Sequence, residues 1–187
     1  MCAATVTGPD WSAVRRELGR AGGRRGDFPT SCYVLQVLHF EKRSVFAASV
    51  EAVFAFHEQP EALERLIPPW DPSKVIVAPT SLAVGTVVIL ETRIGPFRQR
   101  IEAVHTEYEH NELFVDEMRK GPFAYWRHEH RFAAHPQGCL LVDAIEYRPP
   151  LGPLGRLADP IVVRPRLTRM FEWRHRVTAE AVAAPSN

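Results

Sequence analysis

Residues 112–148, ELFVDEMRKGPFAYWRHEHRFAAHPQGCLLVDAIEYR, contain the pattern that decides the fold. Aromatic, β-branched and other apolar residues alternate with polar ones over 112–119, 125–133 and 139–148, which predicts three strands. The connections carry Gly121-Pro122 and Pro136-Gln137-Gly138, which are turn sequences. Because these connections are short, we expect neighbouring strands to pair as antiparallel hairpins.

The same alternation extends towards the N-terminus. It predicts a first strand and three further ones, over 34–46, 74–78, 86–93 and 98–106. After the first strand, Ser49 is a good N-cap for a helix over 50–57. Pro60 can begin a second short helix over 61–66, which the proline-rich segment 67–72 ends.

A final helix is expected from Pro165 to about Ala181, after a proline- and glycine-rich segment at 149–155 that forms an extended loop or a short helical turn. Its inner stripe at helical spacing comprises Leu167, Met170, Phe171, Arg174, Val177 and Ala181. The remaining basic side chains are Arg164, Arg166, Arg169, His175 and Arg176. They form either a solvated face or a contact for an anionic lipid head group.

One strand, two helices, six strands and a long helix is the β-α-α-β6-α order of the helix-grip fold. The chain is therefore predicted to be α+β, with a curved antiparallel seven-stranded sheet wrapped on the C-terminal helix. We expect this domain to span 31–182, with 1–30 as a flexible N-terminal appendage and 183–187 as a C-terminal tail. A sheet this strongly bent leaves a cavity beneath the helix, and 67–72 and 149–155 are candidates for its rim.

Composition restricts the functional classes. A formal charge of +1 over 187 residues gives no general attraction to nucleic acid. Cys2, Cys32 and Cys139 form no Cys-x-x-Cys pair, which suits a reducing compartment. We find neither the apolar centre of a signal peptide nor an apolar run of membrane-spanning length, so a cytoplasmic location is expected. The oligomeric state is not predicted.

Three stretches resemble bacterial proteins of the SRPBCC superfamily, which includes START lipid-binding domains, aromatase/cyclases and the birch-pollen-allergen class. They are 114–132, 66–70 and 143–155. The resemblance runs from roughly residue 40 to residue 177. It implies the helix-grip fold and a ligand-binding cavity, but no particular reaction, because one fold carries many functions.

Polar side chains interrupt the apolar faces of the three strands in 112–148. If the two turns set the register, Asp116 lies opposite His128, and His130 lies near Asp143. Three interpretations remain open: a satisfied structural network, recognition of a ligand's polar end, and acid–base or metal chemistry. A lone His-x-His is a weak metal signal, so we assign neither a metal nor a cofactor.

The favoured function is the binding, transport or sequestration of a small hydrophobic or amphipathic molecule. The candidate ligand-binding residues are Phe114, Asp116, Met118, Trp126, His128, His130, Phe132, Asp143, Tyr147, Leu167, Met170, Phe171 and Arg174. An alternative is a cyclase, dehydratase or isomerase that transfers protons through His128, His130, Asp116 and Asp143. A protein-interaction module is a further alternative.

Overall fold

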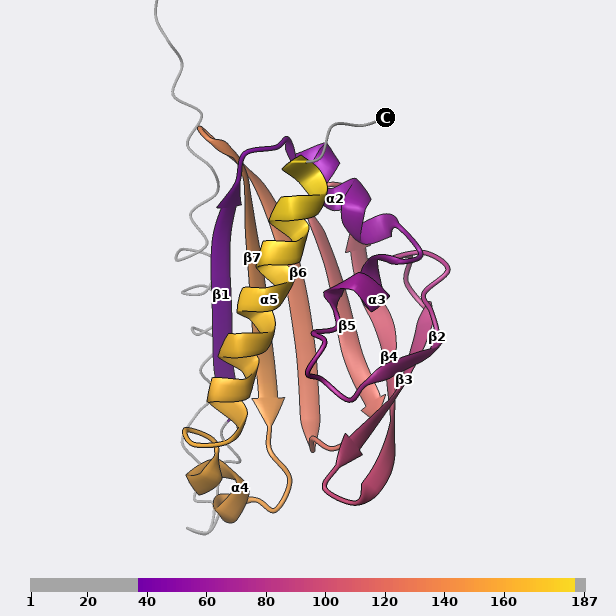
Figure 1. Cartoon of the computed structure of the whole chain (residues 1–187), viewed down its shortest axis with the longest axis vertical. Helices are drawn as coiled ribbons and strands as arrows, with labels where there is room; N and C mark the ends of the chain where they lie inside the picture. Colours follow the sequence, from indigo (N-terminus) through magenta and orange to yellow (C-terminus); the bar gives the residue numbers. More distant parts are fainter. Residues whose placement is uncertain (1–36, 184–187) are drawn as a thin grey trace, which may run out of the picture. The chain divides into compact units, whose positions relative to one another are not determined.

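An antiparallel sheet covered on one face by helices makes up residues 37–183, the part of the chain that the computed structural model describes (Figure 1). The predictions for residues 1–36 and for 184–187 lie outside these residues, whereas Ala183, predicted to begin the C-terminal tail, is helical. The strands are β1 (Leu38–Phe46), β2 (Lys74–Val77), β3 (Val87–Ile94), β4 (Phe97–Glu109), β5 (Leu113–Lys120), β6 (Tyr125–His135) and β7 (Gly138–Arg148). The helices are α2 (Val50–Glu58), α3 (Ala62–Leu66), α4 (Pro153–Ala158) and α5 (Val163–Ala183).

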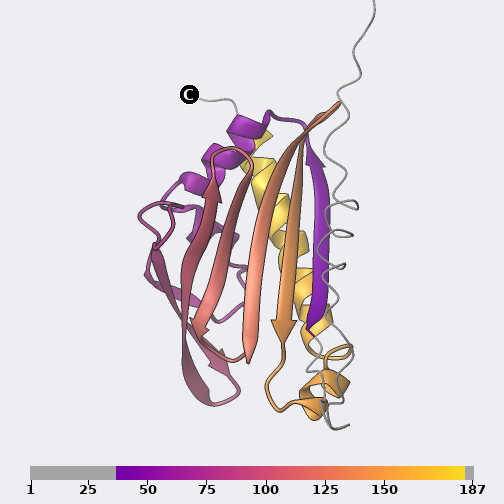
Figure 2. The ribbon, with the colours of Figure 1, turned by 180° about the vertical axis from the view of Figure 1, so that it is seen from behind.

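The sheet order is β1-β7-β6-β5-β4-β3-β2, so every hairpin predicted from a short turn pairs as expected. The first strand forms one edge of the sheet and pairs with the last strand, with Phe40 opposite Ile145 and Ser44 opposite Leu141. Figure 2 shows the uncovered face, with α5 running behind it. The predicted fold class and element order are confirmed, and α4 is a short helix within the segment expected to be a loop or helical turn.

Two local features hold the β1–α2 corner in place. The Ser49 hydroxyl accepts a hydrogen bond from the Ala52 N–H at 3.3 Å, which caps α2 as predicted. In the β6–β7 turn, Gly138 has a φ of +129°, and a Cβ there would collide with the carbonyl oxygen of Phe46. Glycine is therefore required where the turn passes the end of β1.

Two apolar clusters lie on the covered face of the sheet. One surrounds Phe54 of α2, whose ring lies 5.0 Å from that of Phe132. The other lies beneath α5, where Phe40 contacts Phe171 at a ring distance of 5.5 Å. Along β7, Leu141 belongs to the first cluster and Ile145 to the second, so the residue between them sits between the two cores.

A buried hydrogen bond anchors the connection from α4 to α5. The Tyr147 hydroxyl donates to Oδ1 of Asp159 at 2.7 Å, and both side chains are buried. Replacing Tyr147 by Phe would leave this carboxylate without the donor, so we expect the free energy of unfolding to fall by about 1.5–3 kcal/mol. Urea denaturation measures this loss. Tyr125→Phe on the opposite face is the control, and an equal loss in both variants would contradict the prediction.

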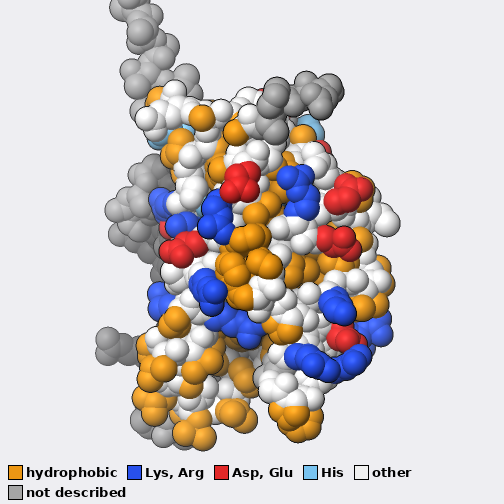
Figure 3. All heavy atoms as spheres, in the orientation of Figure 1, with side chains coloured by type: hydrophobic (Ala, Val, Ile, Leu, Met, Phe, Trp, Pro, Cys, Tyr) orange, Lys and Arg blue, Asp and Glu red, His pale blue; other side chains and the backbone are white. Residues whose placement is uncertain are grey.

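The α4 region presents apolar side chains to solvent. Leu154 and Leu157 of α4 are exposed, as are the neighbouring Leu151 and Ile161, and Figure 3 shows hydrophobic atoms gathered there. Within residues 37–183, every helix is too short or too polar to cross a membrane.

Candidate functional site

Asp143, located between the two apolar clusters, is the centre of a buried polar network. Its Oδ1 accepts a hydrogen bond from Nε2 of His128 at 2.8 Å, and its Oδ2 accepts one from Nε2 of His175 at 2.6 Å. All three side chains are buried. A buried carboxylate requires such donors. Asp143 therefore links β7 to β6 and to α5 through the interior.

The network continues to β1. Nδ1 of His175 lies 2.7 Å from Oγ of Ser44 and accepts a hydrogen bond from this hydroxyl in the neutral ring, because the other ring nitrogen donates to Asp143. Serine, histidine and aspartate in this order are the components of a hydrolase triad. Ser44, however, lies beneath α5 and lines neither of the grooves described below. We therefore assign it the role of orienting His175.

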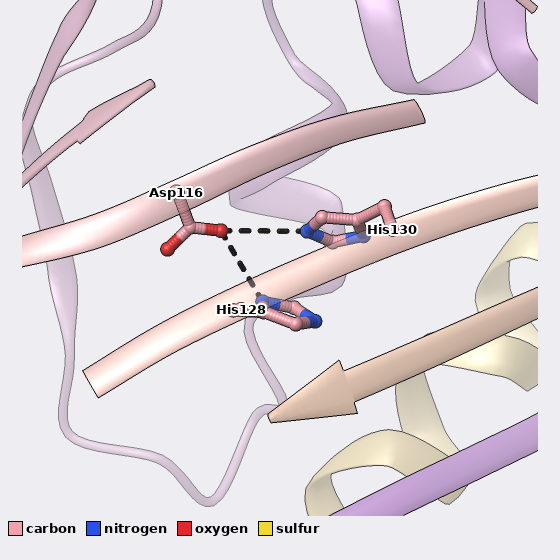
Figure 4. A group of neighbouring side chains, drawn as sticks. All are labelled: Asp116, His128 and His130. Atoms are coloured by element: carbon pink, nitrogen blue, oxygen red, sulfur yellow. Dashed lines mark ion pairs between the residues drawn. The ribbon is translucent and has the colours of Figure 1, made fainter. Parts of the chain in front are cut away.

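Asp116 and the two histidines of β6 form the other half of the network (Figure 4). Oδ2 of Asp116 lies 3.2 Å from Nδ1 of His128 and 3.4 Å from Nε2 of His130. The His130 ring stacks on Phe114 at 3.9 Å. Its Nδ1 is 2.8 Å from Oδ1 of Asp143, but it makes no hydrogen bond of good geometry. Two imidazoles thus converge on one carboxylate oxygen.

Further imidazoles surround this group. His105 of β4 faces Asp116 across the β4–β5 pair and is buried, and its Nδ1 has no hydrogen-bond partner. His57 of α2 is also buried, with Nδ1 donating to the carbonyl oxygen of Val53 at 2.8 Å, and its ring lies 6.1 Å from that of His130. The covered face of the sheet therefore carries more buried histidines than the two that the pattern of residues 112–148 predicted.

Burial and neighbouring charges shift the pKa values of these groups in opposite directions. Burial alone would lower the pKa of His128, but the attraction of Asp116 and the hydrogen bond to Asp143 outweigh it and raise the pKa to about 9. For both Asp116 and Asp143, burial would raise the pKa, but the histidines hold it well below its usual range. Burial lowers the pKa of His57 to about 4. At neutral pH, His128 is thus cationic and His57 neutral.

Arg174 of α5 brings a second positive charge close to the carboxylates. Burial lowers its pKa, while Asp143 and Asp116 act in the opposite direction. Its guanidinium carbon lies 5.0 Å from the Phe171 ring centroid, a cation–π contact. Arg174 is thus close enough to both carboxylates to feel their charge, although its Nε has no hydrogen-bond partner.

The assignment of His175 to the polar face of the last helix was wrong. The buried residues of α5 are Leu167, Phe171, His175 and Thr178, whereas Met170, Arg174, Val177 and Ala181 are only half-buried. His175 follows Phe171 by four positions, so its spacing did indicate the buried side. A histidine can occupy such a position when a carboxylate faces it.

The structure places every candidate ligand-binding residue on or beside the covered face of the sheet. The predicted register is confirmed, with Asp116 opposite His128 and His130 opposite Asp143. The buried members of the set are Phe114, His128, His130, Phe132, Asp143, Tyr147, Leu167 and Phe171. The half-buried members are Asp116, Met118, Trp126, Met170 and Arg174.

The least buried part of this face is not where the cavity was expected. Directly beneath α5, the network and the Phe40–Phe171 cluster occupy the space. Half-buried apolar side chains instead lie further across the sheet, where Leu90 is opposite Ile101 and Ala103 is opposite Met118. The reason is physical: the buried Asp143 needs a donor from α5, and that contact draws helix and sheet together.

A groove of about 370 Å³ lies between α5 and the segment preceding β2. Its lining residues are Trp70, Asp71, Pro72, Pro165, Arg166, Arg169 and Met170. Arg166 pairs with Asp71 at 2.9 Å, and the guanidinium of Arg169 lies 4.2 Å from the Trp70 ring centroid. The proline-rich segment 67–72, a candidate for the rim of the cavity, thus forms one wall of a groove. Met170 is the only one of the candidate ligand-binding residues that lines it. A second, more open hollow lies between residues 47–51 and 134–138.

These features agree with the comparison of the chain with known families. The family described as polyketide cyclase / dehydrase and lipid transport matches residues 46–171, about two thirds of the chain. The chain belongs to this family. In this polyketide cyclase/dehydrase and lipid transport domain, the half-buried apolar residues of the covered face lie over β3–β6. No curated protein matches the chain.

Solved structures confirm the helix-grip fold. The di-domain ARO/CYC BexL from the BE-7585A biosynthetic pathway has a TM-score of 0.64 at 19% identity, covering 82% of this chain and 52% of that one. TTHA0849 from Thermus thermophilus has a TM-score of 0.61 at 16% identity, with 81% and 100% covered. A nucleoside-diphosphate sugar epimerase from Corynebacterium glutamicum has a TM-score of 0.61 at 23% identity over 75% of this chain, which spans only 28% of that protein.

Proposed function

We propose that this domain binds a small, largely apolar or amphipathic molecule against the open part of the covered face, over β3–β6. The observation that carries the proposal is the partial exposure of Leu90, Ile101, Met118 and Trp126 on the side of the sheet that faces the helices. In a filled core such side chains are buried. Left partly open beside a buried polar network, they form the wall of a binding site.

The network supplies the polar end of this site. The Asp116 side chain is 21% exposed, whereas those of His128 and Asp143 are 3% and 4% exposed. Asp116 is therefore the member that a ligand hydroxyl or amine would meet first. A few fixed polar groups in an apolar wall orient a ligand rather than supply most of its affinity.

The groove beside Trp70 is the proposed route to this face. Met170 lines the groove and also packs against the apolar cluster beneath α5. Ser73, just beyond the groove wall, donates to the Thr92 hydroxyl on β3 at 3.0 Å, which ties the wall to the inner face. The family's role in lipid transport supports a hydrophobic ligand. The cysteine pattern favours a cytoplasmic location for this function.

Filling the proposed site is expected to weaken binding. We predict that Met118→Trp weakens binding of the apolar anion 8-anilinonaphthalene-1-sulfonate at least about tenfold, because the indole would occupy the space that the probe requires. Fluorescence titration measures the affinity, and thermal denaturation confirms folding. Val45→Trp, an apolar-to-indole change on the exposed face of β1, is the matched control. Equal affinity in both variants, or no uptake by the wild-type protein, would refute the site.

A second candidate function is proton transfer on the bound molecule, as in a cyclase, dehydratase or isomerase. The hydrogen-bonded Asp143–His128 pair, with Asp116 at the other nitrogen of the ring, favours it, because a cationic imidazole is a general acid. His128→Gln and His130→Gln would then preserve probe binding and abolish turnover. If both properties survive the substitutions, the network serves structure alone.

A further inference from the structure

Three atoms that could bind a metal ion, one carboxylate oxygen and two imidazole nitrogens from adjacent strands, converge in the polar network, as Figure 4 shows. Oδ2 of Asp116 lies 3.2 and 3.4 Å from Nδ1 of His128 and Nε2 of His130, and all three atoms lie within 4.8 Å of one another. Ligand atoms of a tetrahedral ion with bonds of about 2.0–2.1 Å are about 3.3 Å apart. Charge-assisted hydrogen bonds are shorter, at about 2.7–2.9 Å. The two carboxylate distances therefore match the spacing of metal ligands.

The surrounding hydrogen bonds determine which ring nitrogen of His128 is available. Nε2 donates to Asp143, so in the neutral ring Nδ1 carries a lone pair that points at Asp116. A nitrogen lone pair and a carboxylate oxygen repel each other unless a cation lies between them. That cation is either a proton on the ring or a metal ion.

Asp143 provides the support that metal-binding histidines require. An imidazole that coordinates through one nitrogen usually donates through the other to a carboxylate, which fixes the tautomer and the ring orientation. His128 makes this bond to Asp143 at 2.8 Å. Asp116 and Asp143 together also carry two negative charges, which offset a divalent ion next to the positively charged Arg174.

We propose that Asp116, His128 and His130 bind one divalent transition-metal ion of the zinc type, leaving a fourth coordination position open. Two histidines and a carboxylate with one open position form a known zinc ligand set. Closing the site requires the two imidazole nitrogens, which lie within 4.8 Å of each other, to approach to about 3.3 Å. Asp116 is the most exposed of the three residues, at 21% against 3% for His128 and 11% for His130, so solvent reaches the site from its side. Metal binding is independent of that ligand and goes beyond the proposed function.

Cobalt(II) is the probe for this site, because four-coordinate Co²⁺ has intense visible absorption bands. The full chain, treated with a chelator and dialysed, is titrated with CoCl₂ at pH 8, and competition with ZnCl₂ gives the zinc affinity. We expect one equivalent to bind with four-coordinate bands. His130→Gln and Asp116→Asn are each expected to weaken binding at least about 100-fold, and Asp143→Asn about 10–100-fold.

Two controls make the result decisive. His39→Gln removes a histidine whose side chain is 63% exposed and is expected to leave the affinity unchanged. Circular dichroism verifies that each variant is folded, and Asp116→Asn provides the test if His130→Gln fails to fold. The proposal is overturned if the wild-type protein shows no four-coordinate bands, if His130→Gln and Asp116→Asn bind like the wild type, or if thiolate charge-transfer bands show cysteine coordination. Binding of the organic probe is measured separately, so either proposal can fail alone.

Discussion

Asp143→Ala is expected to lower the free energy of unfolding by about 3–5 kcal/mol, the usual effect of removing one partner from a buried ion pair. The wild-type carboxylate accepts hydrogen bonds from His128 and His175. Its negative charge also stabilises the cationic form of His128. Without it, His175 loses its acceptor and the cationic His128 keeps only the longer contact to Asp116. Urea denaturation at pH 7 measures the change.

Glu146→Ala is the matched control, because Glu146 lies on the same strand but its side chain is 44% exposed on the other face. We expect this variant to change stability by less than about 1 kcal/mol, as for an exposed ion pair. If Asp143→Ala were as mild as Glu146→Ala, the network would contribute nothing to folding and its polar groups would have other partners.

Stability is expected to reach a maximum near pH 6.5 and to fall on either side. The folded-state pKa of His128, about 9, exceeds the ordinary value of 6.5. Its stabilising contribution is therefore complete below pH 6.5 and is lost as the pH rises through 9, a loss of roughly 3 kcal/mol. His57 behaves in the opposite way. Its folded-state pKa is about 4, so the unfolded chain takes up a proton first and stability falls between pH 6.5 and 4.

The acidic branch steepens further below about pH 4, because the pKa values of Asp116 and Asp143 lie far below their ordinary values in the folded state. Urea denaturation of the metal-free protein across pH 2–10 records the profile. In His128→Gln the decline between pH 6.5 and 9 should disappear, whereas His39→Gln should retain it. A wild-type profile that is flat across this alkaline range would show that His128 is not held as a cation.

The period-2 pattern of residues 112–148 was sufficient to predict half of the candidate site. Side-chain alternation places Asp116 and His128 on one face, and the short turns set the register that makes them opposite neighbours. The same reasoning paired His130 with Asp143. These contacts are local in the sheet, so the spacing of residues along the chain contains them.

The other half depends on elements that are distant in sequence. Ser44 and His175 are separated by 131 residues, and their contact exists only because β1 pairs with β7 and α5 crosses both. His105 shows no local sign of facing Asp116, because β4 contains irregularities in its pairing with β5. A register shift cannot be recognised from alternation that is read along one strand.

The sequence by itself determined the element order, the buried face of each strand and the Asp–His pairs across β5, β6 and β7, because side-chain alternation and short turns act over a few residues. Tertiary structure alone decided where the covered face is filled. Asp143 draws α5 onto β6 and β7 through His175, and half-buried apolar side chains remain over β3–β5 and at Trp126. A buried charge is stable only when a partner offsets it. For Asp143 that partner is His175, which lies 32 residues further along the chain.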